Sequence, residues 1–197
     1  MRSRTNANSH GRCRRYRLEA NYPPRGPRPV VKSLDSDTKP INRQKIGIAE
    51  YAVVTDETVL ITSGLGSCLG IVFHDPKALV SGLIHVMLPS VDQARDSTPA
   101  KFVDTGLPLL IDEMASAGAS PSRLQAWIAG GSEMIQFTAS GGSIGSRNIE
   151  MATQFLDDHS IDLVDSDVGG NHGRSIAFDP AEPALTIRTA DDTEQTM

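Results

Sequence analysis

Residues 64–89 read GLGSCLGIVFHDPKALVSGLIHVMLP, and this stretch decides the fold. Its two apolar runs, 68–74 and 80–88, have the Val- and Ile-rich composition of strands. The intervening Asp75-Pro76-Lys77-Ala78 is a turn sequence, because Pro76 suits the first central position of a type I turn and Asp75 can accept hydrogen bonds from the turn backbone. The stretch therefore predicts two antiparallel strands.

Cys68 and His85 lie at matching distances from this turn, one on each predicted strand. If Asp75 faces Ala78 across a turn of even length, the same register sets Cys68 directly opposite His85, with Cβ atoms about 4.5–5.5 Å apart. A turn of odd length would break the match, because a shift of one residue moves a side chain to the other face of the sheet. We therefore expect the thiol and the imidazole to share one face.

A cysteine beside a histidine is a pattern typical of nucleophilic catalysis. A free thiol has a pKa of about 8.5 and is mostly unreactive at neutral pH, so an imidazole that takes its proton supplies the thiolate nucleophile. The glycines of the preceding bend let the backbone turn sharply, so the amides of Ser67 and Cys68 can stabilise an oxyanion. Thr62 offers a hydroxyl that can orient the ring of His85.

Each of these residues also has an ordinary structural explanation. Cys68 can be an inert core thiol, His85 a core histidine satisfied by backbone, and Thr62 a normal component of a Val- and Ile-rich strand. The glycine pairs at 130–131 and 141–142 have neither the lysine nor the spacing of a phosphate-binding loop. Residue types alone leave the catalytic and the structural explanations open.

The rest of the chain favours an α+β domain. Residues 47–54 and 58–62 have the pattern of a hairpin. One helix is expected to begin at Thr98-Pro99 and to end at Gly118, and a second is expected between Ser143 and His159. Further strands are expected at 124–128, 161–167, 174–178 and 184–188. Runs of strands with helices inserted between them favour an α+β fold over a regular βαβ array.

Composition indicates one soluble domain. The chain has 197 residues, of which 39% are hydrophobic and 22% are charged. It has no apolar run long enough to span a membrane and no N-terminal signal pattern, so we expect cytoplasmic localisation. Cys13 and Cys68 lie in segments of opposite character and the five histidines lack the spacing of a metal site, so no disulfide, metal or cofactor is predicted.

Charge divides the chain into two parts. Residues 1–45 carry 12 Lys or Arg against three acidic residues, whereas the remainder carries 7 basic against 21 acidic residues. The first part is predicted to be a disordered basic extension, and because it lacks interleaved aromatics and a recognition motif, no nucleic-acid partner is expected. We expect the acidic part to work in a salty cytoplasm, since salt screens self-repulsion; ordinary solubilising charge is the alternative.

Several motifs resemble, in order and spacing, those of the chemoreceptor glutamine deamidases, the CheD family. The resemblance covers approximately residues 46–190, and its motifs are Gly64-Leu65-Gly66-Ser67-Cys68, His74-Asp75-Pro76, GLIHVMLP at 82–89, Gly130-Gly131-Ser132-Glu133-Met134, Ile144-Gly145-Ser146-Arg147-Asn148 and DVGGNHGR at 167–174. The basic extension departs from the family pattern. So does His172, which stands where an aromatic residue is often expected.

The resemblance implies hydrolysis of the side-chain amide of selected glutamines in methyl-accepting chemotaxis receptors, leaving glutamate. The family's Cys, His and Thr triad matches Cys68, His85 and Thr62. A layered α/β/β/α sandwich, with two mixed sheets packed together and helices outside, is implied as well. So is a CheC-type phosphatase as a partner, with contact to the membrane only through the receptors.

These expectations define the predicted organisation of the chain. It comprises a basic extension over 1–45, a deamidase domain over 46–190 and an acidic tail over 191–197. The expected chemistry is acyl transfer to water through a thioester, which requires no cofactor or metal. The alternative is a non-catalytic adaptor that binds the phosphatase and the receptors.

Overall fold

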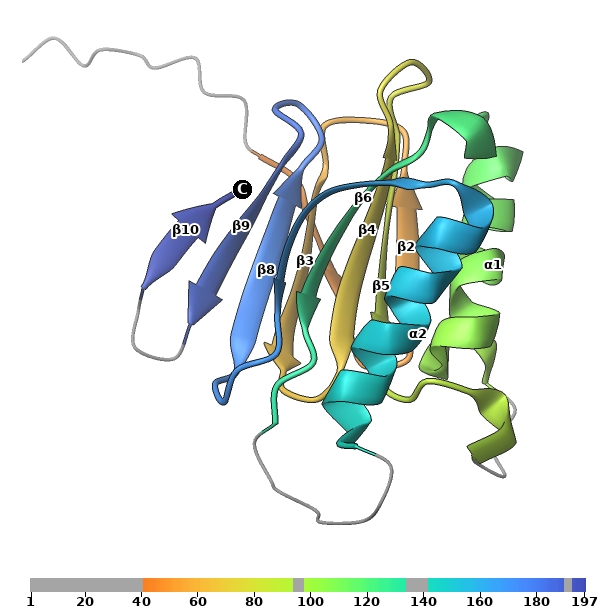
Figure 1. The fold of residues 1–197 in the computed structure, drawn as a ribbon. Coiled ribbons are helices and arrows are strands. Elements are labelled where there is room, and N and C mark those ends of the chain that lie inside the picture. The colour runs from red at the N-terminus through yellow and green to blue at the C-terminus, as the bar shows by residue number, and fades with distance from the viewer. Residues whose placement is uncertain (1–40, 94–97, 134–141, 190–192) are drawn as a thin grey trace, which may run out of the picture. The chain divides into compact units, whose positions relative to one another are not determined.

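Two five-stranded sheets packed together form the fold in the computed structural model, which describes residues 41–93, 98–133, 142–189 and 193–197 (Figure 1). The strands of sheet A are, in order, β1 (Arg43–Ile46), β3 (Val59–Leu65), β8 (Arg174–Asp179), β9 (Ala184–Thr189) and β10 (Glu194–Thr196). The strands of sheet B are, in order, β2 (Tyr51–Val54), β5 (Val80–Val86), β4 (Leu69–Asp75), β6 (Gln125–Gly130) and β7 (Asp162–Val168). Only β1 with β3 and β6 with β7 are parallel among the strand pairs of the described residues. The predicted α+β class with two mixed sheets is confirmed.

The two α-helices of the described residues pack on sheet B (Figure 1). The helix α1 (Val103–Ser116) lies against β5 and β2, and α2 (Ile144–His159) lies against β4 and β7. Within the described residues, three short 3₁₀ helices complete the helical segments: η1 (Val91–Gln93), η2 (Pro99–Lys101) and η3 (Pro121–Arg123). In the described part of the chain, the outer face of sheet A carries no helix, which differs from the expectation of helices outside both sheets. The strand β8 shows why, because its residues alternate between buried and half-buried, so one face can remain in water.

The quoted stretch forms the centre of the fold. Every residue of β4 and β5 is buried. One hydrophobic cluster, which includes Ile71 and Leu110, fills the space between sheet B and the helices. A second, which includes Val72 and Phe178, fills the space between the sheets. Neighbouring residues of one strand therefore enter different clusters, and this explains why both strands are apolar without interruption.

The predicted hairpin of residues 47–54 and 58–62 is wrong. The strand β2 pairs with β5 in sheet B, whereas β3 pairs with β1 and β8 in sheet A. The polar segment 55–58 therefore crosses from one sheet to the other. Sheets stack about 10 Å apart, a distance that a few extended residues span as readily as they form a tight turn.

Local capping signals set the start of α2. As predicted, Ser143 precedes the helix, and its Oγ accepts the N–H of Ser146 at 3.0 Å. The first predicted helix is divided instead. Pro99 begins η2, and α1 begins only at Val103 after the extended residue Phe102.

Sheet A continues past both predicted domain boundaries. The strand β1 begins at Arg43, inside the predicted extension, and β10 lies in the predicted tail. Both join sheet A through backbone pairing, β1 with β3 and β10 with β9. Residues 1–40 of the predicted extension lie outside the described residues. Among the described helices, none combines the length and the apolar character needed to cross a bilayer.

Candidate active site

A buried hydrogen-bonded pair connects the two sheets. Thr62 of β3 and His85 of β5 are both fully buried, and Thr62 Oγ1 lies 2.7 Å from His85 Nδ1. The Thr62 hydroxyl also donates to the carbonyl oxygen of Ile46 at 2.8 Å. Because a hydroxyl has one proton and that proton is directed at Ile46, the Thr62 oxygen accepts from the Nδ1–H of His85. Neutral His85 therefore carries its lone pair on Nε2.

Burial sets the protonation of His85 and Cys68. It lowers the pKa of His85, since a buried imidazolium loses the water that stabilises its charge. Burial also raises the pKa of the Cys68 thiol, and the backbone N–H of Cys68 offsets this only in part. The resting site therefore holds a neutral imidazole and a neutral thiol. His85 Nε2 is buried and has no hydrogen-bond partner among the described residues, so no group of the described chain occupies its lone pair.

Cys68 lies half-buried in the bend between β3 and β4, and the carbonyls of this bend are held in place. The carbonyls of Gly66 and Cys68 accept backbone N–H groups of the segment 130–132 at 2.7 and 2.8 Å. The carbonyl of Ser67 accepts from Asn148 Nδ2 at 2.8 Å. The glycine pair at 130–131, which has no phosphate-binding pattern, thus supports the cysteine bend. A Cβ at position 130 would collide with the carbonyl oxygen of Cys68.

These anchored carbonyls orient two amides. In a trans peptide, each C=O points away from the N–H of the following residue. The carbonyl of Gly66 points toward Ser132, so the N–H of Ser67 points away from Ser132. In the same way, the carbonyl of Ser67 points toward Asn148, so the N–H of Cys68 points away from Asn148. No backbone carbonyl in the part of the chain that the structure describes accepts either N–H. These are the two amides that the sequence predicts as oxyanion donors, and their orientation is compatible with that role.

The predicted register between Cys68 and His85 is wrong by two residues. Asp75 faces Val80 instead of Ala78, and Gly70 faces His85. The turn causes the shift. The carboxylate of Asp75 accepts the N–H groups of residues 77 and 78 while its carbonyl accepts that of residue 79, so four residues form the turn.

Cys68 and His85 nevertheless lie toward the same face of sheet B. Side chains alternate along a strand, so Cys68 shares a face with Gly70, the direct partner of His85. Cys68 is thus the diagonal neighbour of His85, at a separation of about 7–8 Å between Cα atoms in regular sheets. Their side chains form no hydrogen bond in the structure. Catalytic hydrogen bonds are often long without substrate and tighten in the substrate complex.

Gly70 is a site residue that sequence reasoning missed. A Cβ at this position would lie 2.6 Å from Ile176 Cδ1 and 3.3 Å from Thr62 Cγ2. The absence of a side chain at Gly70 therefore leaves the room in which Thr62 and His85 meet. A glycine within an apolar strand is the signal that indicates such a close approach.

The motif at 167–174 holds Ser132, which belongs to the segment that binds the carbonyls of the cysteine bend. Arg174 is buried, and its guanidinium forms two hydrogen bonds of 2.9 Å with the carboxylate of Asp167. It also donates to Ser132 Oγ at 2.7 Å, and Ser132 Oγ donates to the carbonyl of His172 at 2.5 Å. This network ties residues 169–173 to the segment that holds the Cys68 bend. His172 contributes its backbone carbonyl to the network, which does not depend on an aromatic side chain.

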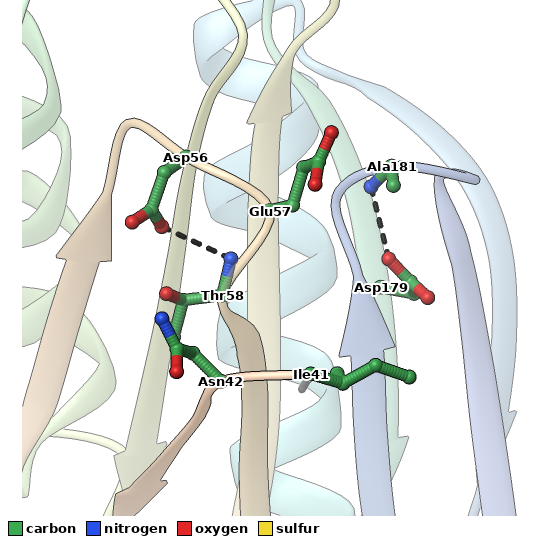
Figure 2. A pocket seen from close by; sticks show the side chains of 7 residues that line it. All are labelled: Ile41, Asn42, Asp56, Glu57, Thr58, Asp179 and Ala181. Carbon is green, nitrogen blue, oxygen red and sulfur yellow. Dashed lines mark hydrogen bonds between the residues drawn. The ribbon is translucent and has the colours of Figure 1, made fainter. Parts of the chain in front are cut away.

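A pocket at the opposite end of the sandwich contains none of the predicted site residues (Figure 2). Its lining residues are Ile41, Asn42, Asp56, Glu57, Thr58, Asp179 and Ala181. Two of its carboxylates hold local turns: Asp56 accepts the N–H of Thr58 at 3.0 Å, and Asp179 accepts that of Ala181 at 2.9 Å. Across the described residues, no group of three or more His, Cys, Asp or Glu side chains is placed to hold a metal ion.

The fold and the site together define a class: an α+β two-sheet domain that directs a cysteine bend and a buried neutral histidine toward one face of a sheet. Comparison with known families narrows this class. The family model described as CheD chemotactic sensory transduction matches residues 87–189. The chain belongs to the CheD family, which confirms the resemblance seen in the sequence.

Relatives with this family name match most of the chain. A probable chemoreceptor glutamine deamidase CheD of Haloarcula marismortui is 46% identical over 155 residues, which are 79% of this chain and 90% of the relative. One of Natronomonas pharaonis is 44% identical over 168 residues, 85% of this chain and 100% of the relative. Another of Desulforamulus reducens is 45% identical over 151 residues, which are 74% of this chain and 89% of the relative. Among solved structures, Neisseria meningitidis protein NMB0706 covers 66% of this chain and 63% of its own at 10% identity and a TM-score of 0.42, too weak a likeness to define the fold.

Proposed function

We propose that this chain hydrolyses the side-chain amide of glutamines in methyl-accepting chemotaxis receptors, a protein-glutamine glutaminase activity exerted in the cytoplasm. The names of its relatives support the substrate. The observation that carries the chemistry is the hydrogen bonding of Thr62, whose hydroxyl donates to the Ile46 carbonyl and lies 2.7 Å from His85 Nδ1. Thr62 holds the proton on Nδ1, so the lone pair on Nε2 is available as a base on the face that Cys68 shares.

The first half of the reaction forms a thioester. The Cys68 thiol transfers its proton to His85 Nε2, and its sulfur bonds to the carbon of the glutamine carboxamide. The negative charge that develops on the amide oxygen is accepted by the N–H groups of Ser67 and Cys68, each worth about 3–4 kcal/mol in comparable sites. His85 then returns the proton to the amide nitrogen, the C–N bond breaks, and ammonia departs.

The second half releases glutamate. A water molecule gives a proton to His85 as its oxygen bonds to the thioester carbon, and the same two amides hold the oxyanion. The C–S bond then breaks, and the sulfur recovers its proton from His85. The cycle restores the neutral thiol and neutral imidazole of the resting site, and no step requires a metal or a cofactor.

This activity changes charge on the receptor. Each converted glutamine becomes a carboxylate, which methylation can mask, so the reaction contributes to adaptation in chemotaxis. The receptors are the protein substrates, and the chain contacts the membrane only through them. A CheC-type phosphatase is proposed as a second partner that restrains or redirects the activity.

The test compares two cysteine variants. The full chain is incubated with a purified cytoplasmic fragment of a chemotaxis receptor from the same organism, and receptor peptides are analysed by mass spectrometry. Wild-type protein is expected to add about 1 Da for each glutamine converted to glutamate, and Cys68→Ala is expected to add none. Cys13→Ala, which changes the other cysteine of the chain, is the matched control and is expected to retain activity.

Two outcomes would overturn parts of the proposal. Conversion by Cys68→Ala at the wild-type rate would exclude Cys68 as the nucleophile. If the wild-type protein converts no glutamine but binds the receptor fragment or the phosphatase, the chain is an adaptor instead of an enzyme.

A further inference from the structure

Asn148 is a fully buried residue of α2 whose amide contacts both halves of the candidate site. Its Nδ2 donates to the carbonyl of Ser67 at 2.8 Å and to the carbonyl of Met87 at 3.1 Å. Ser67 immediately precedes Cys68, and Met87 follows His85 by two residues. We propose that Asn148 is a positioning residue that fixes the Cys68 bend against the end of β5 and orients one oxyanion amide. This inference rests on the proposed deamidase function.

Asn148 acts where the sheet no longer holds the two strands together. The backbone pairing of β4 with β5 ends at Leu69 and Val86. Cys68 lies one residue beyond that pair, and the two carbonyls held by Asn148 lie on the two chain segments that continue past it. Its two amide protons therefore replace the missing pairing and limit how far the bend can move from His85.

The bond to Ser67 also determines a peptide orientation. The carbonyl of Ser67 and the N–H of Cys68 belong to the same planar peptide group, so holding one orients the other. Without Asn148, this peptide can rotate and turn the Cys68 N–H away from the developing oxyanion. The preceding peptide keeps its own anchor, because the carbonyl of Gly66 accepts the N–H of Ser132 at 2.7 Å. Loss of Asn148 is thus expected to remove one of the two oxyanion donors.

Two further features indicate that the position of this side chain matters. Asn148 Oδ1 is buried without a hydrogen-bond partner among the described residues, an arrangement that costs stability. All hydrogen bonds of this side chain to the described residues are thus donated by Nδ2. In addition, a Cβ at Gly145 would collide with the carbonyl oxygen of Gly131, so the first turn of α2 lies directly against the segment that supports the bend.

The test separates oxyanion stabilisation from thiol reactivity. Attack of the Cys68 thiolate on iodoacetamide displaces iodide from carbon and develops no oxyanion, whereas attack on a glutamine carboxamide does. Asn148→Ala is expected to lower kcat for receptor deamidation on the order of 100-fold, the usual effect of removing one oxyanion donor. KM is expected to stay at the wild-type value, because Asn148 is fully buried. The rate of Cys68 alkylation by iodoacetamide is expected to fall much less than kcat, because the carbonyls of Gly66 and Cys68 keep their own backbone partners and still hold the bend.

Leu156→Ala is the matched control, since Leu156 is buried in the same helix and does not contact the cysteine bend. It is expected to lower thermal stability while preserving kcat per folded molecule. If Asn148→Ala does not fold, Asn148→Leu is measured instead, because leucine fills a similar volume and has no hydrogen-bond donor. Wild-type kcat in either variant, or deamidation and alkylation falling by the same factor, would overturn the inference. Absence of deamidation by the wild-type protein would instead refute the proposed function.

Discussion

Replacing Thr62 by valine tests how the candidate base is prepared. Valine has nearly the shape of threonine but no hydroxyl, so Thr62→Val leaves the packing between the sheets intact. It removes the acceptor for His85 Nδ1–H and the donor to the carbonyl of Ile46. We expect the imidazole to lose its fixed tautomer, and a fraction of the molecules will then carry the proton on Nε2, where it blocks proton transfer from Cys68.

The structure allows the size of this effect to be estimated. Both groups left without a partner are buried, and an unsatisfied buried group costs about 1–3 kcal/mol. Since about 1.4 kcal/mol corresponds to a tenfold change in an equilibrium, the reactive tautomer of His85 is expected to fall by roughly 5- to 140-fold. The value of kcat should fall by the same factor. KM should not change, because Thr62 is fully buried and does not reach the substrate.

The assay combines deamidation kinetics with alkylation of Cys68 by iodoacetamide. Thr62→Val should slow both reactions, because both need His85 to accept the thiol proton. Thr62→Ser, which restores the hydroxyl, should recover most of both rates. Thr186→Val makes the same change in β9 on the outer face of sheet A and should leave both at wild-type values. Wild-type kcat in folded Thr62→Val, or no recovery in Thr62→Ser, would refute the proposed role.

Three further predictions concern the frame of the site and the whole domain. Gly70→Ala should lower stability by about 1–3 kcal/mol and slow deamidation, because its Cβ would lie 2.6 Å from Ile176 Cδ1; urea unfolding and activity assays check this. Asp75→Asn should be less stable than wild type near pH 7, and the difference should begin to shrink only below about pH 4 and close well below pH 3. Burial alone would raise the pKa of Asp75, but Arg123 and three backbone N–H groups outweigh burial and hold that pKa well below its ordinary range. The contribution is therefore full above the ordinary carboxyl pKa of about 4 and is lost as pH falls from there through the lowered pKa of the folded state. The free energy of unfolding should also rise with KCl concentration, and a salt-independent value would show that the acidic surface only provides solubility.

Local patterns predicted most of the secondary structure. The start of α2 after Ser143 and the strands β4 to β9 follow from capping residues, glycines and apolar runs that act over a few residues. The short edge strands β1 and β10 were missed, because Arg43–Ile46 and Glu194–Thr196 are mostly polar and become strands through pairing with their neighbours in sheet A. The hairpin prediction failed for the same reason, since composition does not determine which sheet a strand joins.

The candidate site was predictable in its residues but not in its geometry. Cys68, His85 and Thr62 could be proposed from their chemistry and from the family resemblance. Their register could not, because it depends on which of the turn residues the carboxylate and carbonyl of Asp75 hold. Asn148 was not proposed as a site residue either. Its partners are 81 and 61 positions away, and nothing in the local sequence indicates those contacts.

The most direct test of the proposed mechanism is to trap the covalent intermediate. A glutamine-containing receptor fragment is mixed with wild-type protein, quenched with acid within the first turnover and analysed by mass spectrometry of the peptide that contains Cys68. We expect an adduct equal to the substrate minus about 17 Da, the mass of the ammonia lost when the thioester forms, and we expect no adduct with Cys68→Ser or on Cys13. Deamidated receptor that accumulates without any adduct on Cys68, together with deamidation by Cys68→Ser at the wild-type rate, would contradict the mechanism.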